Sequence, residues 1–283
     1  ECARVQHESH GLGLGRRHGC ISYQFGDVLR GNLHNYDEKG FLFGNFRNRE
    51  TLENLQSLIL GTPNTYQSPA HAVNFLEVHD DYCFNDYLRL SSSRNSKDDI
   101  IQDPMKHIEL DDDLLRKNKL GALVLLTSQG IPIIHQGQDW AHSQIIVETD
   151  ADDADVGKMD RNPYNKDNET NWVNWLEKEQ NKELADYYSG LIDLRRTHSE
   201  FRHATKKDFK FQGLADHALG YVIRDRVAVY INGENSMGID TDLPLGNWQL
   251  MVNQNEVNLN GIRQISGKIS IPPTSGMVLQ RIN

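Results

Sequence analysis

The sequence predicts an α/β fold, in which a parallel βαβ unit is followed by an antiparallel β-sandwich. Apolar runs at residues 72–78 and 131–135 flank a helical pattern that starts near Asp113 and ends by Gly130. A strand, a helix and a strand with short connections form a parallel unit. After residue 203 the chain changes to period-two runs separated by Gly, Asn and Pro, which is typical of a small sandwich. The expected strands there are residues 209–211, 219–223, 227–231, 248–252, 269–271 and 278–282.

Other segments carry local signals. Residues 20–25 form an apolar run that predicts a strand, and residues 26–31 should turn into a short helix. Residues 50–60 and 184–198 carry apolar side chains at helical spacing, so both predict amphipathic helices. The glycines within residues 11–15 fit no phosphate-binding fingerprint, and we expect a loop there.

Composition narrows the function classes. The 283 residues include 40 acidic and 30 Lys or Arg side chains, for a formal charge of −10. This balance speaks against a nucleic-acid partner, which would need a basic surface. No window approaches the roughly 18 apolar residues of a membrane span, so we expect no membrane partner.

The cysteines and the N-terminus leave the compartment open. The three cysteines lack C-x-x-C spacing, so a disulfide framework or a cysteine-based zinc site is not expected. The chain begins with Glu1, without an initiator Met or a signal-peptide pattern, and this predicts a cut or processed end. Secreted, periplasmic and cytoplasmic locations all remain possible.

Polar residues at the ends of the predicted parallel strands are the first candidates for chemistry. His79 and Asp80 follow one strand, and Gln138 and Asp139 lie in the loop after the next. Carboxylates in such positions could act on a glycosidic bond, although a satisfied loop pair is the alternative reading. The nearby aromatic and amide residues would suit sugars, or they are ordinary loop composition: Trp140, Asn162, Tyr164, Asn165 and Asn168.

An acidic segment at residues 148–155 raises the question of a metal ion. It lacks the central Gly and terminal Glu of an EF-hand loop, so a solvated insertion is favoured over a calcium site. Ca²⁺ stays a possible cofactor, and no other cofactor is expected.

Three ordered blocks carry a resemblance to a known family. Residues 73–82, residues 125–139, and residues 162–165 with residues 171–175 resemble type I pullulanases. These are α-1,6-debranching enzymes of the α-amylase superfamily, glycoside hydrolase family 13. The resemblance runs in order from about residue 22 to the C-terminus.

The resemblance implies a fold and a set of site residues. Residues 1–203 would form about strands six to eight of a (β/α)₈ barrel, and residues 204–283 the sandwich domain. Asp80 would stabilise the transition state. The implied substrate-binding residues are His79, Asp81, Tyr82, Gln138, Asp139, Asn162 and Tyr164. The chain departs from the family at Asp81, where Asn is usual, and at Asp139, where Glu is usual.

One family block is missing from the sequence. The resemblance implies a nucleophilic Asp in a G-x-R-x-D block and a general-acid Glu, both before the matching segment, and the chain contains no G-x-R-x-D. We therefore expect a C-terminal portion that binds α-glucan, needs the missing N-terminal barrel half as its partner, and is inactive alone. The alternatives are an α-1,4-acting or branching relative and a non-catalytic carbohydrate-binding or scaffold protein.

Overall fold

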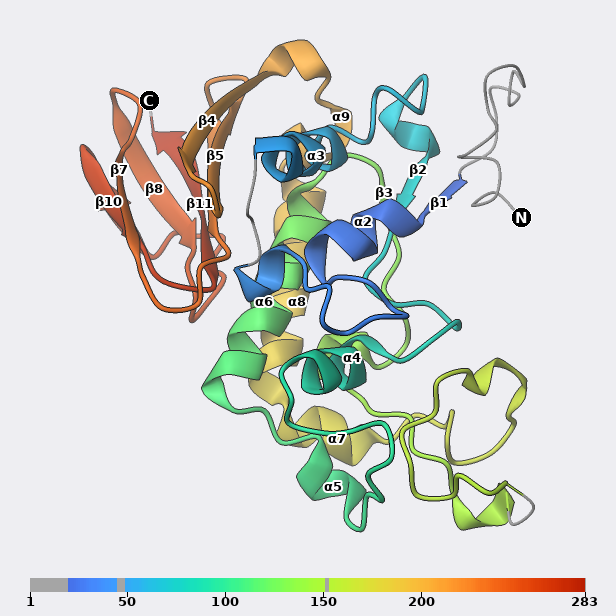
Figure 1. Ribbon diagram of the computed structural model, residues 1–283. Coiled ribbons are helices and arrows are strands. Elements are labelled where there is room, and N and C mark those ends of the chain that lie inside the picture. Colours follow the sequence, from blue (N-terminus) through green and yellow to red (C-terminus); the bar gives the residue numbers. More distant parts are fainter. Residues whose placement is uncertain (1–19, 45–48, 151–152, 283) are drawn as a thin grey trace.

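A small parallel sheet forms one side of the molecule. The computed structural model describes residues 20–44, 49–150 and 153–282, so the loop expected at residues 11–15 lies outside the described residues. Strands β1 (Cys20–Ser22), β2 (Ala72–Asn74) and β3 (Ile131–Pro132) pair in that order, and both pairings are parallel (Figure 1). Val73 of β2 faces Ile131 of β3, which confirms the predicted parallel pair.

The parallel strands are shorter than the apolar runs suggested. Pro132 ends β3 because it has no N–H for the ladder, although the Ile133 N–H still donates to the Asn74 carbonyl at 2.8 Å. The run at residues 20–25 is a strand only up to Ser22. Helix α2 (Tyr23–Leu29) follows at once, since its turn brings Phe25 and Leu29 together in the core.

The main predicted helices are confirmed as α3 (Arg49–Ile59), α6 (Asp112–Thr127) and α8 (Lys182–Thr197). The Asp111 carboxylate caps α6 by accepting the Leu114 N–H at 2.8 Å. The shorter helices are α4 (Phe84–Ser91), α5 (Pro104–His107), α7 (Trp175–Gln180) and α9 (Glu200–His203). The 3₁₀ turns are η1 (Phe41–Phe43), η2 (Pro69–His71), η3 (Gln138–Trp140), η4 (Glu148–Asp150), η5 (Pro163–Asn165) and η6 (Lys206–Asp208). Within the described ranges, no helix combines the length and apolar character needed to cross a bilayer.

The last part of the chain forms two antiparallel sheets. Six strands pair in the order β4-β5-β6-β11-β8-β9, and β10 pairs with β7. All six predicted strands are present, and β7 and β9 are additional because their sequences are too polar to predict a strand. The bounds are β4 (Phe209–Ala215), β5 (Ala218–Ile223), β6 (Val227–Asn232), β7 (Ile239–Asp242), β8 (Asn247–Val252), β9 (Arg263–Ile265), β10 (Lys268–Ile271) and β11 (Ser275–Ile282). Trp248 and Leu279 of the large sheet share a core with Ile269 and Ile271 of the small one, so the two sheets pack face to face.

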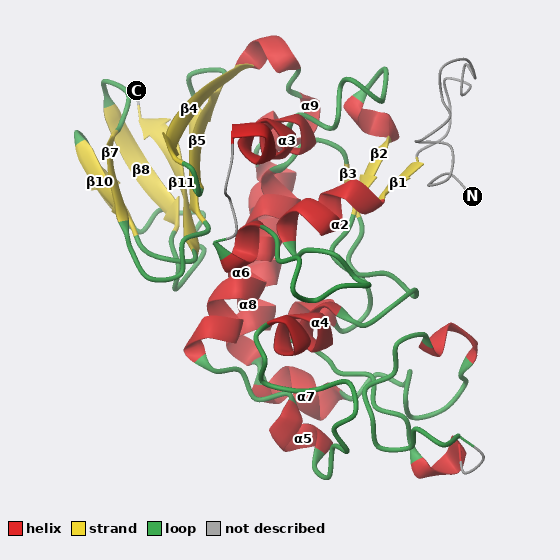
Figure 2. Ribbon diagram, in the orientation of Figure 1, coloured by secondary structure: helices red, strands yellow, loops and turns green. Residues whose placement is uncertain are grey.

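Helices α6 and α8 lie between the antiparallel sheets and the parallel sheet (Figure 2). On α6, the Leu123 side chain lies against Gly276 of β11, where an added Cβ would come within 2.9 Å of it. The Tyr221 hydroxyl donates to Thr127 Oγ1 at 3.0 Å. One hydrophobic core runs from the parallel part into the large sheet. The boundary between residues 203 and 204 therefore stays a prediction.

A buried arginine fixes the turn from α6 into β3. Arg195 of α8 donates to the carbonyls of Leu126 and Ser128 at 2.8 and 2.7 Å, and to the Gly130 carbonyl at 2.7 Å. Burial, reinforced by the charge of Arg202, lowers the pKa of Arg195 to about 10. These bonds satisfy carbonyls at the C-terminal end of α6 and set the direction in which β3 leaves it.

Truncating the contact between α6 and the large sheet tests the shared core. We expect Leu123→Ala to lower the free energy of unfolding by about 2–5 kcal/mol, since it leaves a cavity at a fully buried position. Chemical denaturation measures this. Leu245→Ala is the control, because Leu245 is 93% exposed, and it should change stability little. Equal effects of the two substitutions would contradict a core shared by both parts.

Candidate active site

The centre of the candidate site is Glu77, a fully buried carboxylate three residues beyond β2. Its Oε1 atom accepts from His135 Nδ1 at 2.8 Å and from His142 Nε2 at 2.9 Å. Its Oε2 atom accepts the Phe84 N–H at 2.5 Å. Burial by itself would raise the pKa of Glu77, but His142 and His135 outweigh it and lower that pKa to about 2. Glu77 is therefore an ionised acceptor for two imidazoles.

The loop that carries both histidines is attached to the start of α4. The Asn85 side chain donates to the Ala141 carbonyl at 3.1 Å, and the Cys83 thiol donates to the His142 carbonyl at 3.2 Å. Ala141 adopts a φ of +57°, which an L-residue holds only where its surroundings fix it. The loop is thus positioned by side chains at the start of α4.

A second buried carboxylate, Asp86, holds the continuation of this loop. It accepts the Ser143 hydroxyl at 2.7 Å and the Gln144 N–H at 3.2 Å, and His107 Nε2 lies 3.4 Å from its Oδ1 atom. Asp86 lies in the first turn of α4, where a negative charge is also favoured by the helix dipole. Glu77 and Asp86 together fix the course of the chain after β3.

His79 and Asp80 lie just beyond Glu77 and are open to solvent. Their side chains are 64% and 44% exposed, and His79 Nε2 lies 3.4 Å from Asp80 Oδ1. The Tyr23 hydroxyl of α2 donates to Asp80 Oδ2 at 3.3 Å. Burial, and then the charge of Asp80, raise the pKa of Tyr23, so its hydroxyl keeps the proton that it donates. The Asp80 carboxylate is thereby oriented, and it remains accessible to a ligand.

Asp81 occupies the position where the resembled family usually has Asn. Its φ is +62°, in the left-handed region that Asn and Asp tolerate better than other side chains, so the substitution suits the backbone. Arg161 donates to Asp81 Oδ1 at 2.9 Å and lies 2.7 Å from His34. The carboxylate at this position thus holds a distant loop through an ion pair.

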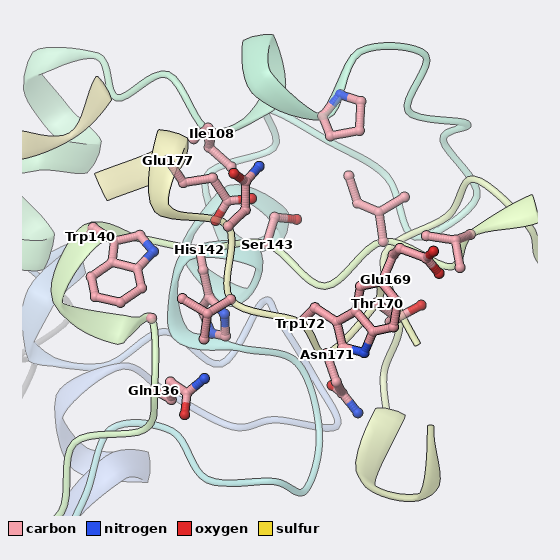
Figure 3. A pocket seen from close by; sticks show the side chains of 16 residues that line it. Ile108, Gln136, Trp140, His142, Ser143, Glu169, Thr170, Asn171, Trp172 and Glu177 are labelled. Atoms are coloured by element: carbon pink, nitrogen blue, oxygen red, sulfur yellow. The ribbon is translucent and has the colours of Figure 1, made fainter. Parts of the chain in front are cut away.

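Two adjoining cavities border these residues. The smaller, of about 230 Å³, is lined by His79, His135, Gln136, His142, Gln144, Pro163, Tyr164 and Asn171. The larger, of about 390 Å³, shares Gln136, His142 and Asn171 with it and adds two tryptophans, Trp140 and Trp172 (Figure 3). Gln144 donates to the Asn171 side chain at 2.8 Å across their common wall. Rings beside amides and imidazoles suit a ligand with both apolar faces and hydroxyl groups.

The residues predicted for substrate binding do not all lie on the cavity. Among them His79 and Tyr164 line the smaller cavity. Tyr82 is buried and packs edge to face against Tyr36. Gln138 is buried as well, and its amide donates to the Tyr188 hydroxyl at 3.0 Å.

Asp139 and Asn162 lie at the margins of this region. Burial raises the pKa of Asp139, which follows Gln138 in the turn η3. Asn162 is exposed, and its backbone N–H donates to Asp160 Oδ1 at 2.8 Å. Neither side chain lines the smaller cavity.

The sequence interpretation missed the cluster of Glu77, His135 and His142. Glu77 and His135 lie within the apolar runs that predict strands, and no pattern in the sequence singles out His142. A charged residue inside an apolar run was the available signal, since a buried carboxylate needs partners. Among the described residues, these three form the group of His, Cys or carboxylate side chains whose ligand atoms could hold a metal ion.

Two acids of residues 148–155, Asp153 and Asp155, are paired with lysines. Lys166 Nζ lies 3.1 Å from Asp153 and 3.0 Å from Asp160, and Lys158 Nζ lies 2.7 Å from Asp155. This arrangement agrees with a solvated insertion more than with a calcium site.

Removing the charge of Asp86 tests whether it holds the loop. Asp86→Asn places amide hydrogens against the Ser143 and Gln144 donors. We therefore expect the free energy of unfolding to fall by about 1–3 kcal/mol. We also expect faster hydrogen exchange at residues 141–147. Hydrogen exchange with mass spectrometry measures the second effect. Asp98→Asn is the exposed control, and exchange that is unchanged in both variants would contradict this role for Asp86.

The curated proteins to which the chain is similar include pullulanases. No family model matches the chain. A pullulanase of Bacillus subtilis (strain 168) is 24% identical over 218 residues, which cover 73% of this chain and 26% of the relative. Pullulanase A of Streptococcus pneumoniae serotype 2 is 25% identical over 219 residues, which cover 66% of this chain and 16% of the relative. The chain therefore spans about a quarter or less of these relatives.

Solved structures of pullulanases share the fold over almost the whole chain. A pullulanase from Bacillus acidopullulyticus matches with a TM-score of 0.75 and 19% identity, covering 93% of this chain and 30% of that one. Pullulanase type I from Bacillus subtilis str. 168, complexed with maltose, matches with a TM-score of 0.73 and 19% identity, covering 94% of this chain and 35% of that one. A pullulanase from Anoxybacillus sp. LM18-11, complexed with maltotetraose, matches with a TM-score of 0.71 and 24% identity, also covering 94% of this chain and 35% of that one. In sequence and in fold the chain is thus similar to pullulanases, and its extent is consistent with a C-terminal portion of a type I pullulanase-like protein.

Proposed function

We propose that the chain forms one side of the substrate cleft of a retaining hydrolase that cleaves α-1,6 branches in α-glucans. The observation that carries this proposal is the position of His79 and Asp80. Both follow the middle strand of the parallel sheet, and His79 borders a cavity lined by a tyrosine ring and amides. Ligands of parallel α/β sheets bind at the carboxyl ends of the strands.

The two exposed side chains have distinct roles in this proposal. Asp80 accepts the hydroxyls of the sugar at the cleavage point and stabilises the oxocarbenium-like transition state. His79 donates a hydrogen bond to the same sugar. Such bonds accelerate the reaction when they strengthen as the ring distorts. The hydroxyl of Tyr23 and the imidazole of His79 both lie within 3.4 Å of Asp80, which keeps its carboxylate oriented.

The fold assignment belongs to the same proposal. We assign β1, β2 and β3 to strands six to eight of a (β/α)₈ barrel within residues 1–203, and residues 204–283 to a sandwich domain. The parallel order of adjacent strands supports this assignment. The nucleophile and the general acid would come from the other barrel half, because this sequence has no G-x-R-x-D block. The chain alone would then bind glucan without hydrolysing it.

The substrate class rests on the cavity and on the relatives. Two of the similar pullulanases carry maltose or maltotetraose in their structures. In this chain the exposed Tyr164 ring offers a surface for the apolar face of a glucose unit. Gln144 and Asn171 offer amide groups for its hydroxyls.

A charge-neutral substitution at Asp80 tests its role in turnover. In a polypeptide that joins this chain to the barrel half carrying the G-x-R-x-D block, we expect Asp80→Asn to lower kcat about 10²–10³-fold or more. Pullulan hydrolysis measures this effect. Asp216→Asn in the turn after β4 is the matched control and should leave kcat unchanged. Equal turnover of the two variants would remove Asp80 from the mechanism.

The same polypeptide tests the bond that is cleaved. Faster hydrolysis of pullulan than of amylose is expected for an α-1,6-debranching enzyme. Preference for amylose would instead favour the α-1,4-acting alternative. Glucan binding without any turnover of either substrate would favour the non-catalytic carbohydrate-binding alternative.

Binding can be measured on the chain itself. We expect Tyr164→Ala to weaken the affinity for maltotetraose by about 2–10-fold, because the stacked ring is lost. Tyr164→Phe keeps the ring and should bind almost as the unchanged protein does. Isothermal titration calorimetry distinguishes these outcomes, and equal affinity of all three proteins would exclude Tyr164 from the sugar site.

A further inference from the structure

We propose that Glu77, His135 and His142 bind a divalent transition-metal ion, with Zn²⁺ as the probe. Their three ligand atoms, one carboxylate oxygen and two imidazole nitrogens, all lie within 4.8 Å of one another. This site does not include Asp80 and requires no sugar, so metal binding can be tested independently of the hydrolase activity.

The hydrogen bonds of the cluster show how a metal would fit. Both imidazole nitrogens lie 2.8–2.9 Å from the same Glu77 oxygen, so two N–H groups point at one anionic atom. A zinc ion lies about 2.0–2.2 Å from each such ligand atom, which requires separations only slightly larger than these. The ion would replace the two protons between the three side chains, and the change would need small side-chain movements.

The donor set selects the class of metal. Two neutral imidazoles and one carboxylate are the ligands of many zinc sites and of non-haem iron sites. Ca²⁺ and Mg²⁺ prefer shells made of oxygen atoms, so the two nitrogen ligands disfavour them. We therefore expect this cluster to bind neither Ca²⁺ nor Mg²⁺ tightly.

The surroundings leave a coordination position open. His135 and His142 both line the smaller cavity, and His142 also borders the larger one (Figure 3). A water molecule can therefore reach the ion from the cavity side. Glu77 closes the opposite side, since its side chain is fully buried. Three protein ligands with one position left for water is the arrangement of catalytic zinc sites.

The ligands are also held in place before any metal arrives. The Phe84 N–H fixes the second oxygen of Glu77, and the Cys83 thiol holds the His142 carbonyl. Ligand orientation by such outer contacts is worth 10–100-fold in metal affinity. The ion would join the end of β2 to the loop after β3, directly beside His79.

Zinc titration of ligand variants tests the proposal. The full chain, stripped with a chelator, is titrated with ZnCl₂ by calorimetry, beside Glu77→Gln, His135→Gln and His142→Gln. Because the sequence holds 12 histidines, His203→Gln is the matched control, an exposed histidine outside the cluster. We expect one tight zinc in the unchanged protein and in the control. Each ligand variant should bind that zinc at least about tenfold more weakly.

Two further measurements separate a lost ligand from a lost fold. His142→Gln keeps a hydrogen-bond donor toward Glu77, and circular dichroism should show native structure in that variant. Co²⁺ should give visible absorption bands of nitrogen and oxygen coordination in the unchanged protein, absent from folded His142→Gln. No tight zinc, or a zinc affinity that is the same in His142→Gln and in His203→Gln, would overturn the proposal, as would equal binding of Ca²⁺.

Discussion

The buried charge of Glu77 is the constraint on which the candidate site depends. An ionised carboxylate away from water is strongly destabilising unless it is paired and hydrogen-bonded. Here the donors come from two different segments: the start of α4 gives the Phe84 N–H, and the loop after β3 gives His135 and His142. The need to satisfy one side chain therefore fixes the relative position of two neighbouring strand ends.

The same logic applies to Asp86 in the first turn of α4. Its carboxylate gathers Ser143 and Gln144, so two buried acids hold consecutive parts of one loop. His79 and Asp80 lie in the short stretch between Glu77 and α4, which is anchored at both ends. Their side chains remain exposed, since the buried Glu77 and Asp86 position the backbone on both sides of them. The buried acids thus position the site, and the exposed side chains are the ones that can contact a ligand.

The sequence predicts regular elements well and irregular ones poorly. Helix α6 and the six apolar strands follow from side-chain periodicity, which depends on neighbours along the chain. Strands β7 and β9 carry too few apolar residues for that signal, and pairing with β10 and with β8 creates them. His79 is predictable as a site residue because it directly follows a predicted strand. The partners of Glu77 lie 58 and 65 residues away, and only the folded loop brings them together.

Support for the site extends back to the antiparallel sheets. Tyr221 of β5 is bonded to Thr127 at the end of α6, and Arg195 of α8 donates to the carbonyls on either side of it, those of Leu126 and Ser128. Strand β3 begins directly after this turn and leads into His135. A shift of α6 against the large sheet would therefore move the start of β3. Because close-packed interiors tolerate little displacement, the large sheet contributes to the precision of a site that it does not touch.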